Sequence, residues 1–320
     1  MTTSSRPVWL LSPEGKPKDF SAIPSGVEYH RVLAGSHRRI GRGILAIVLL
    51  LAGLVFFSLA ANWLSAVIDT GLGNSPSDYT PARHAGSMIG LALLIPWSML
   101  IQRWLYGVPA GSLHSVSSRF RFDLLGKSLL VFGPAWLIVN AFGFLGPVEE
   151  VPWSHADLIA MFLITFLLTP LQAAGEEYGF RGLVFRILGS WTHSRRLGLI
   201  IGIVVTSAAF TAMHGSTDPY IITWYLTLFT CLSVITWRTG GLEIAIVLHA
   251  LLNTLSFLAA FYLRIDFGAA IGDRSAGVGT PYQLLPALVM VVITAIIWWW
   301  TRKSGPARTP DGGFQRGDEE

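Results

Sequence analysis

Two adjacent glutamates in an otherwise apolar stretch are the residues best suited to chemistry. Glu176 and Glu177 lie in the sequence Gly-Glu-Glu-Tyr-Gly-Phe-Arg-Gly, which also contains Arg181. A charged side chain at membrane depth costs about 3 kcal/mol, so a pair of them needs an explanation. The i, i+4 spacing of Glu177 and Arg181 allows an ion pair on one helix face. Glu176 is rotated by about 100° from Glu177 and can point into a cavity. An interfacial ion network without chemistry is the alternative.

Two histidines and an asparagine in later apolar stretches could complete a site with these glutamates. His214 ends the sequence Phe-Thr-Ala-Met-His, and Asn253 follows His249 by one helical turn on the same face. Either histidine alone would more often be a core or capping residue. A rise of 1.5 Å per residue places Glu176 and His214 within about 7 Å in height, on either side of a turn near residues 190–194. If that hairpin protrudes by about 10 Å, all these groups lie at one depth, towards the cytoplasmic side.

A glutamate and a histidine at one depth can deprotonate a water molecule. The second histidine and the amide can then hold a developing oxyanion. Alternatively, two histidines and one glutamate could bind Zn²⁺, with the other glutamate as the base. The single cysteine, Cys231, excludes an intrachain disulfide and a cysteine-based zinc site. The sequence contains no Gly-x-Gly-x-x-Gly, phosphate loop, Gly-x-Ser-x-Gly or His-Glu-x-x-His motif.

The elements that must position these residues are membrane helices. The 320-residue chain has only 13% charged residues and a mean hydropathy of +0.54, whereas soluble domains carry about 25% charged residues. Its apolar residues form runs of about twenty, the length that crosses a bilayer. We therefore predict an all-α, polytopic membrane protein with about eight transmembrane helices and with the site on spans four, five and seven. The predicted spans are residues 44–67, 87–105, 129–144, 157–188, 197–214, 220–237, 242–262 and 282–300.

The segments outside these spans carry weaker signals. Residues up to 42 are polar and predict a mobile tail, too long for a cleaved signal peptide. Residues 115–127 mix arginines with aromatic residues, which suits either a helix lying in the interface or a plain polar loop. The fourth span exceeds one bilayer crossing, so we expect a kink at Pro170 and a protruding end.

Charge asymmetry predicts the orientation of the spans. Basic residues gather in the loops at one end of the predicted helices, and acidic residues mostly in the opposite loops, with Arg83, Arg264 and Arg274 as exceptions. By the positive-inside rule, both termini should be cytoplasmic in a multi-pass protein of the cell membrane. The net charge of +4 is mild and is a topology signal, so we expect no nucleic-acid partner. The acidic residues of the opposite loops are Asp69, Asp78, Glu149, Glu150, Asp218, Asp266 and Asp273.

Three short motifs in this order resemble those of the CPBP family, the CAAX proteases and bacteriocin-processing proteins, also called the Abi family. They are Glu-Glu-x-x-x-Arg from Glu176, Phe-x-x-x-His ending at His214, and His-x-x-x-Asn from His249 to Asn253. Each is weak alone, but the ordered trio is fairly specific. The resemblance divides the chain into a cytoplasmic tail (1–43), N-terminal transmembrane helices (44–150), a catalytic core (151–265), a last loop and helix (266–302) and a C-terminal tail (303–320).

The resemblance implies an intramembrane endopeptidase that acts on a membrane-associated peptide or protein in the lipid bilayer. In the family, the residue matching Glu176 activates water and the one matching His214 helps to position it. Residues matching His249 and Asn253 form the oxyanion site, and those matching Glu177 and Arg181 support it. Members have been described both as metalloproteases and as glutamate peptidases; we favour the mechanism without a cofactor, with zinc as the alternative.

Two functions of other classes also remain open. A non-catalytic membrane protein, such as an immunity protein that binds a peptide or partner, would not need the intact trio. A proton-coupled transporter would also bury Glu and His, but it predicts inverted repeats, which the sequence does not show.

Overall fold

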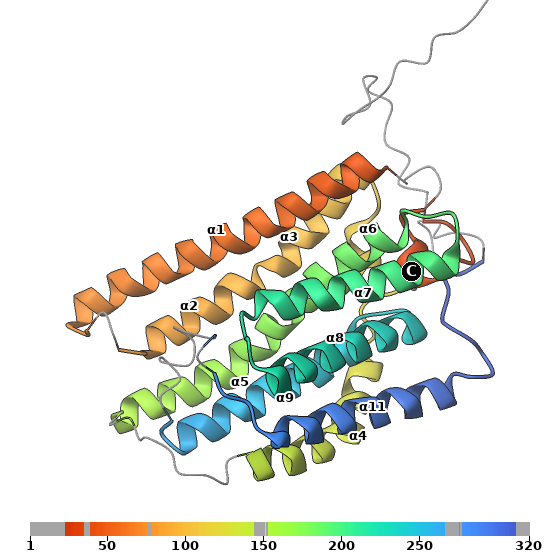
Figure 1. Ribbon diagram of the computed structural model, residues 1–320. Coiled ribbons are helices and arrows are strands. Elements are labelled where there is room, and N and C mark those ends of the chain that lie inside the picture. Colours follow the sequence, from red (N-terminus) through yellow and green to blue (C-terminus); the bar gives the residue numbers. More distant parts are fainter. Residues whose placement is uncertain are drawn as a thin grey trace, which may run out of the picture.

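The structure is a bundle of long helices. The computed structural model describes residues 23–34, 39–75, 78–143, 151, 153–265, 275 and 277–311. Eight helices within these residues are long and apolar enough to cross a membrane (Figure 1). The described residues contain only two isolated β-bridges and no strand. The predicted all-α fold with about eight spans is therefore confirmed.

Two of the eight spans are composite. The second joins α2, α3 and a π-helical turn, and the fourth joins α5, a π-helical segment and α6. The helices are α1 Ile40–Leu72, α2 Pro81–Ala92, α3 Leu94–Ile101, α4 Phe122–Gly143, α5 His155–Glu177, α6 Phe185–Gly189, α7 Arg195–Met213, α8 Pro219–Thr239, α9 Glu243–Tyr262 and α11 Leu284–Trp300. The π-helical segments are η3 Gln102–Tyr106 and η5 Tyr178–Val184, and the 3-10 turns are η1 Tyr29–Arg31, η4 Ala110–Leu113 and η7 Pro281–Gln283.

Local sequence fixes where several helices begin. Ser154 and Asp157 form a reciprocal capping box at the start of α5, which satisfies backbone donors that have no helical partner. The side chain of Asp218 accepts hydrogen bonds from the first turn of α8, and Ser194 does the same for α7. These caps fix the register of the helices that carry the candidate site.

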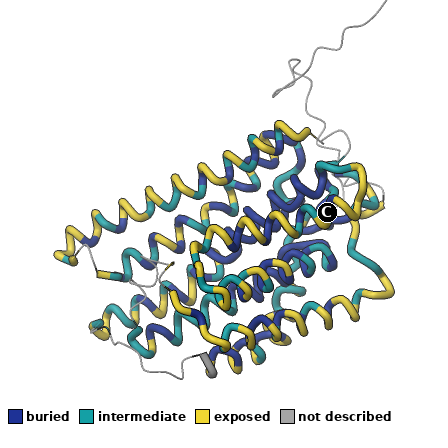
Figure 2. Tube along the Cα trace, in the orientation of Figure 1, coloured by how far each residue is buried: buried dark blue, intermediate teal, exposed yellow. Residues whose placement is uncertain are grey.

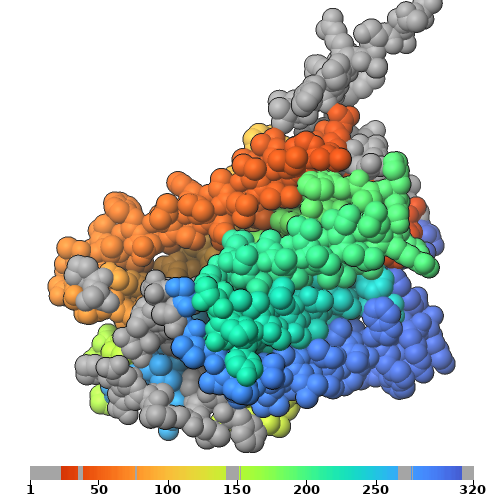
Figure 3. Space-filling view, in the orientation of Figure 1, coloured from red at the N-terminus to blue at the C-terminus, as the bar shows by residue number. Residues whose placement is uncertain are grey.

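The helices differ in how far the rest of the protein encloses them. In its most apolar window α9 is 50% buried, whereas α1 is only 17% buried. Figure 2 shows exposed residues along α1 and α11 and buried residues concentrated between them. In Figure 3, α1 stands along one edge and the face is hollowed beside it. α5 packs against both α2 and α9, and from Gln172 to its end at Glu177 all its residues are buried, where polar groups need protein partners.

The fourth span changes helix type immediately after the two glutamates. Pro170 lies inside α5, where we expected a kink. The π-helical segment η5 begins at Tyr178 and ends at Val184. A π-bulge inserts an extra residue into the helical repeat and often marks a functional site. The irregularity at Tyr178 was not predicted, and it includes Arg181.

The predicted interfacial helix at residues 115–127 is wrong. Residues 115–121 form turns and α4 begins at Phe122, so the polar-loop alternative holds for the first half. The side chain of Arg121 does not face lipid phosphates: its Nε and Nη2 donate to the carboxylate of Glu243, at 2.8 and 2.6 Å. Because that carboxylate is fully buried at the start of α9, it requires such a charged partner.

The N-terminal and C-terminal segments meet at one end of the bundle. The Gly26 amide donates to the Thr309 carbonyl at 3.1 Å, and the Thr309 amide donates to Val27 at 2.9 Å. The two described ends therefore lie on the same side, as an even number of spans requires. Whether that side is cytoplasmic remains a prediction. Of the acidic residues used for it, Glu149, Glu150, Asp266 and Asp273 lie outside the described residues, as does Arg274.

The predicted mobile tail does not extend through residues 23–34. Tyr29 and Leu33 are fully buried there, and Arg31 donates to the carbonyls of Gly189 and Thr192, both at 2.8 Å. The sequence does not predict this ordered segment, because its apolar residues are too few and too scattered to indicate a helix or a strand. Residues 1–22 and 312–320 lie outside the described residues.

Candidate active site

A glycine lets α5 approach its neighbours closely at the site. A Cβ atom on Gly175 would lie 2.0 Å from the carbonyl oxygen of Leu91, close to where α2 ends and α3 begins. Backbone cannot give way as a flexible side chain can, so this contact requires glycine. The close approach fixes the position of the next residue, Glu176.

The ion pair predicted from the i, i+4 spacing is present. Arg181 Nη1 lies 3.2 Å from Glu177 Oε1, and both side chains are fully buried. The guanidinium of Arg181 also lies 4.7 Å from the ring centres of Phe210 and of Phe229. Aromatic faces stabilise a desolvated cation, so carboxylate and rings together enclose this arginine.

His249 lies between the two glutamates. Its Nδ1 is 2.8 Å from Glu177 Oε1, and its Nε2 is 3.5 Å from Glu176 Oε2. Since a carboxylate only accepts, Nδ1–H is the donor to Glu177, which fixes the orientation of the ring. The sequence paired Glu177 with Arg181 alone and missed this second contact, because α5 and α9 are far apart in the chain.

Gln172 belongs to the site, and sequence reasoning missed it. Its Nε2 donates to Glu176 Oε2 at 2.7 Å, and its Oε1 accepts from Asn253 Nδ2 at 3.1 Å. Asn253 therefore reaches Glu176 through Gln172. Two signals could have identified it: an amide in an apolar helix, and an i, i+4 spacing to Glu176.

His214 caps the C-terminus of α7 beside the same aromatic wall. Its Nδ1–H donates to the Phe210 carbonyl at 2.7 Å, which leaves the lone pair of a neutral ring on Nε2. Its ring centre lies 5.1 Å from that of Phe229, and the ring of His249 lies 6.4 Å from it on the α9 side. The two histidines, like Arg181, are thus arranged around Phe229.

The two glutamates differ in burial, and this difference decides which of them a water molecule or substrate can reach. The side chain of Glu176 is 11% exposed, whereas that of Glu177 is 0% exposed. A water molecule or substrate can therefore meet Glu176 and not Glu177. A proton on His249 would make the set of Glu176, Glu177, Arg181 and His249 electrically neutral, the arrangement that costs least in an enclosed interior.

The zinc alternative requires three protein ligands around one ion. In the described part of the chain, no three His, Cys, Asp or Glu side chains are grouped so as to hold a metal ion. His249 Nδ1 lies 2.8 Å from Glu177 Oε1, and its Nε2 lies 3.5 Å from Glu176 Oε2. Metal-ligating histidines commonly donate their other ring N–H to a carboxylate, so zinc stays the alternative to the mechanism without a cofactor.

Comparisons with known proteins bear on the same segment. Residues 155–255 match the family model described as type II CAAX prenyl endopeptidase Rce1-like. Heme A synthase from Sphingopyxis alaskensis is 26% identical over 201 residues, which are 60% of this chain. They are 54% of that protein, so the chain spans about half its length, and the match does not bear on the site. No solved structure matches the chain.

The fold is that of a multi-pass helical membrane protein. The match over residues 155–255 confirms the resemblance to the CPBP family of CAAX proteases that was drawn from the three motifs. All six residues singled out from the sequence fall within this segment.

Proposed function

We propose that this protein is an intramembrane endopeptidase that hydrolyses a peptide bond in a membrane-associated substrate, with Glu176 as the base. The observation that carries the proposal is the unequal burial of two adjacent carboxylates. The Glu176 side chain keeps 11% of its surface exposed and lies 3.5 Å from His249 Nε2, while the Glu177 side chain is 0% exposed and contacts Nδ1 of the same ring. One carboxylate is available for chemistry and the other for positioning.

The reaction follows from these contacts. Glu176 accepts a proton from water as the water oxygen attacks the scissile carbonyl carbon. His214 Nε2 accepts a hydrogen bond that orients this water. His249 Nε2–H and the amide of Asn253 donate to the oxyanion as it forms. Glu176 then returns the proton to the leaving nitrogen as the carbon–nitrogen bond breaks, which leaves an acid and an amine.

The supporting residues hold the reacting ones in place. Glu177 accepts from His249 Nδ1–H at 2.8 Å, and Arg181 balances its charge at 3.2 Å. Gln172 donates to Glu176 Oε2 at 2.7 Å, which fixes the orientation of the carboxylate that receives the proton. The carboxylate is therefore preorganised before substrate arrives, and little reorganisation is needed during the reaction.

The test is the Glu176→Gln variant, which keeps the shape of the side chain and removes the proton acceptor. Proteolytic activity should fall by about 10² or more. The substrate can be found by comparing membrane peptides in cells that carry the wild type or Glu176→Gln, because uncleaved peptides accumulate in the variant. Asp78→Asn, an exposed carboxylate between α1 and α2, is the matched control and should change nothing. Full proteolytic activity in Glu176→Gln would rule out Glu176 as the base. If the wild type cleaves no membrane peptide that the variant leaves intact, the binding-protein alternative takes the place of a protease.

Metal content separates the glutamate mechanism from the zinc mechanism. The purified, active protein should keep its activity in a tight chelator, because no proposed step uses a metal ion. Stoichiometric zinc that is lost together with activity, and that restores activity when added back, would replace the proposed mechanism by the zinc-dependent one.

The orientation also belongs to the proposal. A reporter that is active only outside the cytoplasm, fused to the C-terminus, should give no signal if both ends are cytoplasmic. A strong signal would invert the protein and move the site to the opposite half of the membrane.

A further inference from the structure

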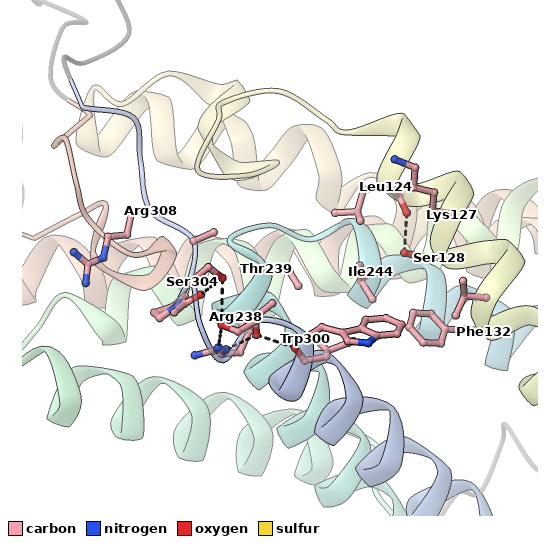
Figure 4. A pocket seen from close by; sticks show the side chains of 16 residues that line it. Leu124, Lys127, Ser128, Phe132, Arg238, Thr239, Ile244, Trp300, Ser304 and Arg308 are labelled. Atoms are coloured by element: carbon pink, nitrogen blue, oxygen red, sulfur yellow. Dashed lines mark hydrogen bonds between the residues drawn. The ribbon is translucent and has the colours of Figure 1, made fainter.

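An open cavity lies apart from the glutamates, at the end of the bundle where residues 26–27 pair with residue 309. It has a volume of about 860 Å³ and opens between the start of α4, the end of α8, the start of α9, the end of α11 and residues 301–308 (Figure 4). None of the residues of the candidate active site lines it. Its size is within the usual range for small-molecule sites.

The walls of this cavity are apolar and its rim is basic. The walls include residues on α4, α9 and α11, among them Leu124, Phe132, Ile244 and Trp300. The basic residues that line it are Lys127, Arg238 and Arg308, and no carboxylate does so. An occupant that satisfies both parts needs an apolar chain and a negative charge.

The cavity lies at the level where spans end. α4 begins at Phe122 and α11 ends at Trp300, so Lys127 and the 301–308 segment lie near the ends of their helices. Helix ends of a membrane protein lie near the lipid headgroups. The apolar walls therefore extend towards the hydrocarbon, and the basic rim is at headgroup level.

Two of the three cations are able to receive a new partner. The Lys127 side chain is 74% exposed, and its ion pair with Asp123 spans 3.4 Å at the surface. Arg308 is 51% exposed and lies 4.0 Å from Glu28. Exposed pairs of this kind are weak. Arg238 differs, because its Nη2 donates to the Thr301 carbonyl at 2.5 Å and so holds the end of α11.

We propose that this cavity binds an anionic phospholipid of the bilayer, with an acyl chain against the α4 and α11 walls and the headgroup along the basic rim, where Lys127 and Arg308 lie at opposite ends (Figure 4). Basic pockets between transmembrane helices recognise lipid headgroups through charge. A zwitterionic lipid lacks the net negative charge that the rim complements. Free phosphate lacks the chain that the apolar walls need. This site does not depend on the proposed protease activity.

The test measures lipid retained by the purified full-length chain after exchange into mixed micelles that contain phosphatidylglycerol or phosphatidylcholine, read by native mass spectrometry. Phosphatidylglycerol should be retained on the order of tenfold more. The double variant Lys127→Gln/Arg308→Gln should lose that preference. Arg103→Gln/Arg196→Gln removes two exposed charges that do not line the cavity and should keep it. Thermal unfolding of each variant checks that it is folded.

A third variant tests the apolar walls separately. Leu124→Trp fills the cavity and leaves the charges in place, so it should reduce retention of phosphatidylglycerol by a similar factor. Inorganic phosphate should not displace the lipid. Equal retention of both lipids, an unchanged preference in Lys127→Gln/Arg308→Gln, or displacement by inorganic phosphate would each overturn the proposal.

Discussion

Two fully buried arginines on the same span, Arg181 and Arg186, are held in different ways. Arg181 faces the carboxylate of Glu177 at 3.2 Å, and Glu177 in turn holds His249. Arg186 contacts neutral oxygens: its Nη2 donates to the Ser112 carbonyl at 2.5 Å, and its Nη1 donates to Gln102 Oε1 at 3.3 Å. Each guanidinium also lies over aromatic rings, so the acceptors and not the rings distinguish them.

Tyr29, which lies against Arg186, is a further uncharged neighbour of that arginine. Its ring lies 3.9 Å from the guanidinium of Arg186, and its hydroxyl donates to the Leu113 carbonyl. Burial raises the pKa of Tyr29 to about 12, so the hydroxyl stays neutral at physiological pH and supplies no counter-charge. Arg186 therefore ties the η1 and η4 turns to the helix through dipoles. Arg181 instead belongs to a set of ionisable side chains that includes Glu176, whose side chain is 11% exposed.

The comparison teaches that burial of a charge does not by itself identify a functional site. At Arg181 the ion pair with Glu177 continues through His249 to Glu176, which keeps a small exposed area. The Arg186 hydrogen bonds described above go to neutral oxygens of Ser112 in the η4 turn and Gln102 in η3. Substitutions of the two arginines should therefore differ in kind: one should affect stability and catalysis, and the other stability alone.

The largest effect is expected for Arg181→Ala. It leaves Glu177 buried without its cation, and breaking a buried pair typically costs about 3–5 kcal/mol. Both the yield of folded protein and the activity of the folded fraction should fall, because Glu177 also orients His249. Thermal unfolding and turnover per folded molecule measure the two effects.

Arg181→Lys is the matched variant for this pair. Lysine keeps the charge but cannot present a planar fork or cover the ring faces in the same way, so it should rescue only in part. Normal yield and activity in Arg181→Ala would show that the contact with Glu177 is not needed.

Arg186→Met should have a smaller effect. It leaves the Ser112 carbonyl and the Gln102 amide oxygen without a donor, at about 1–3 kcal/mol for an unsatisfied buried group, but it strands no charge. The free energy of unfolding should fall, while turnover per folded molecule should stay at the wild-type value. A loss of turnover in the folded fraction would show that Arg186 is coupled to the site and would remove the distinction between the two arginines.

The spans could be predicted because lipid imposes a simple rule on composition. Runs of about twenty apolar residues identified all eight helices, and the i, i+4 spacing identified the pair of Glu177 and Arg181. The helical rise predicted that His214 and His249 lie at a similar depth in the membrane. In the structure both rings lie beside Phe229. These inferences use only local periodicity and helical rise.

The remaining contacts depend on how helices pack, which periodicity does not determine. The contact of Arg121 with Glu243 could not be predicted, because Glu243 lies far along the chain and is brought to it only by the fold. The burial of residues 23–34 depends on the hairpin turn that they cover. The π-helical segment at Tyr178 carries no clear sequence signal, although it separates the glutamates of α5 from Arg186 on α6.

The smallest effect, and the sharpest test of the comparison, is expected for Gln172→Met. Methionine has a similar length and keeps the helix, but it removes the donor to Glu176 Oε2 and the acceptor for Asn253. A lost hydrogen bond to a charged group is worth about 1.5–3 kcal/mol, which corresponds to at least a tenfold fall in kcat if the bond orients Glu176 for the chemical step. KM should change little, because Gln172 is not proposed to touch substrate.

Gln102→Met is the matched control, because Gln102 Oε1 accepts a hydrogen bond from Arg186 at 3.3 Å and not from a residue of the candidate active site. It should lower the free energy of unfolding and leave kcat unchanged. A fall in kcat for Gln102→Met as large as that for Gln172→Met would mean that both glutamines act through general stability. The assignment of Gln172 as a positioning residue would then be wrong.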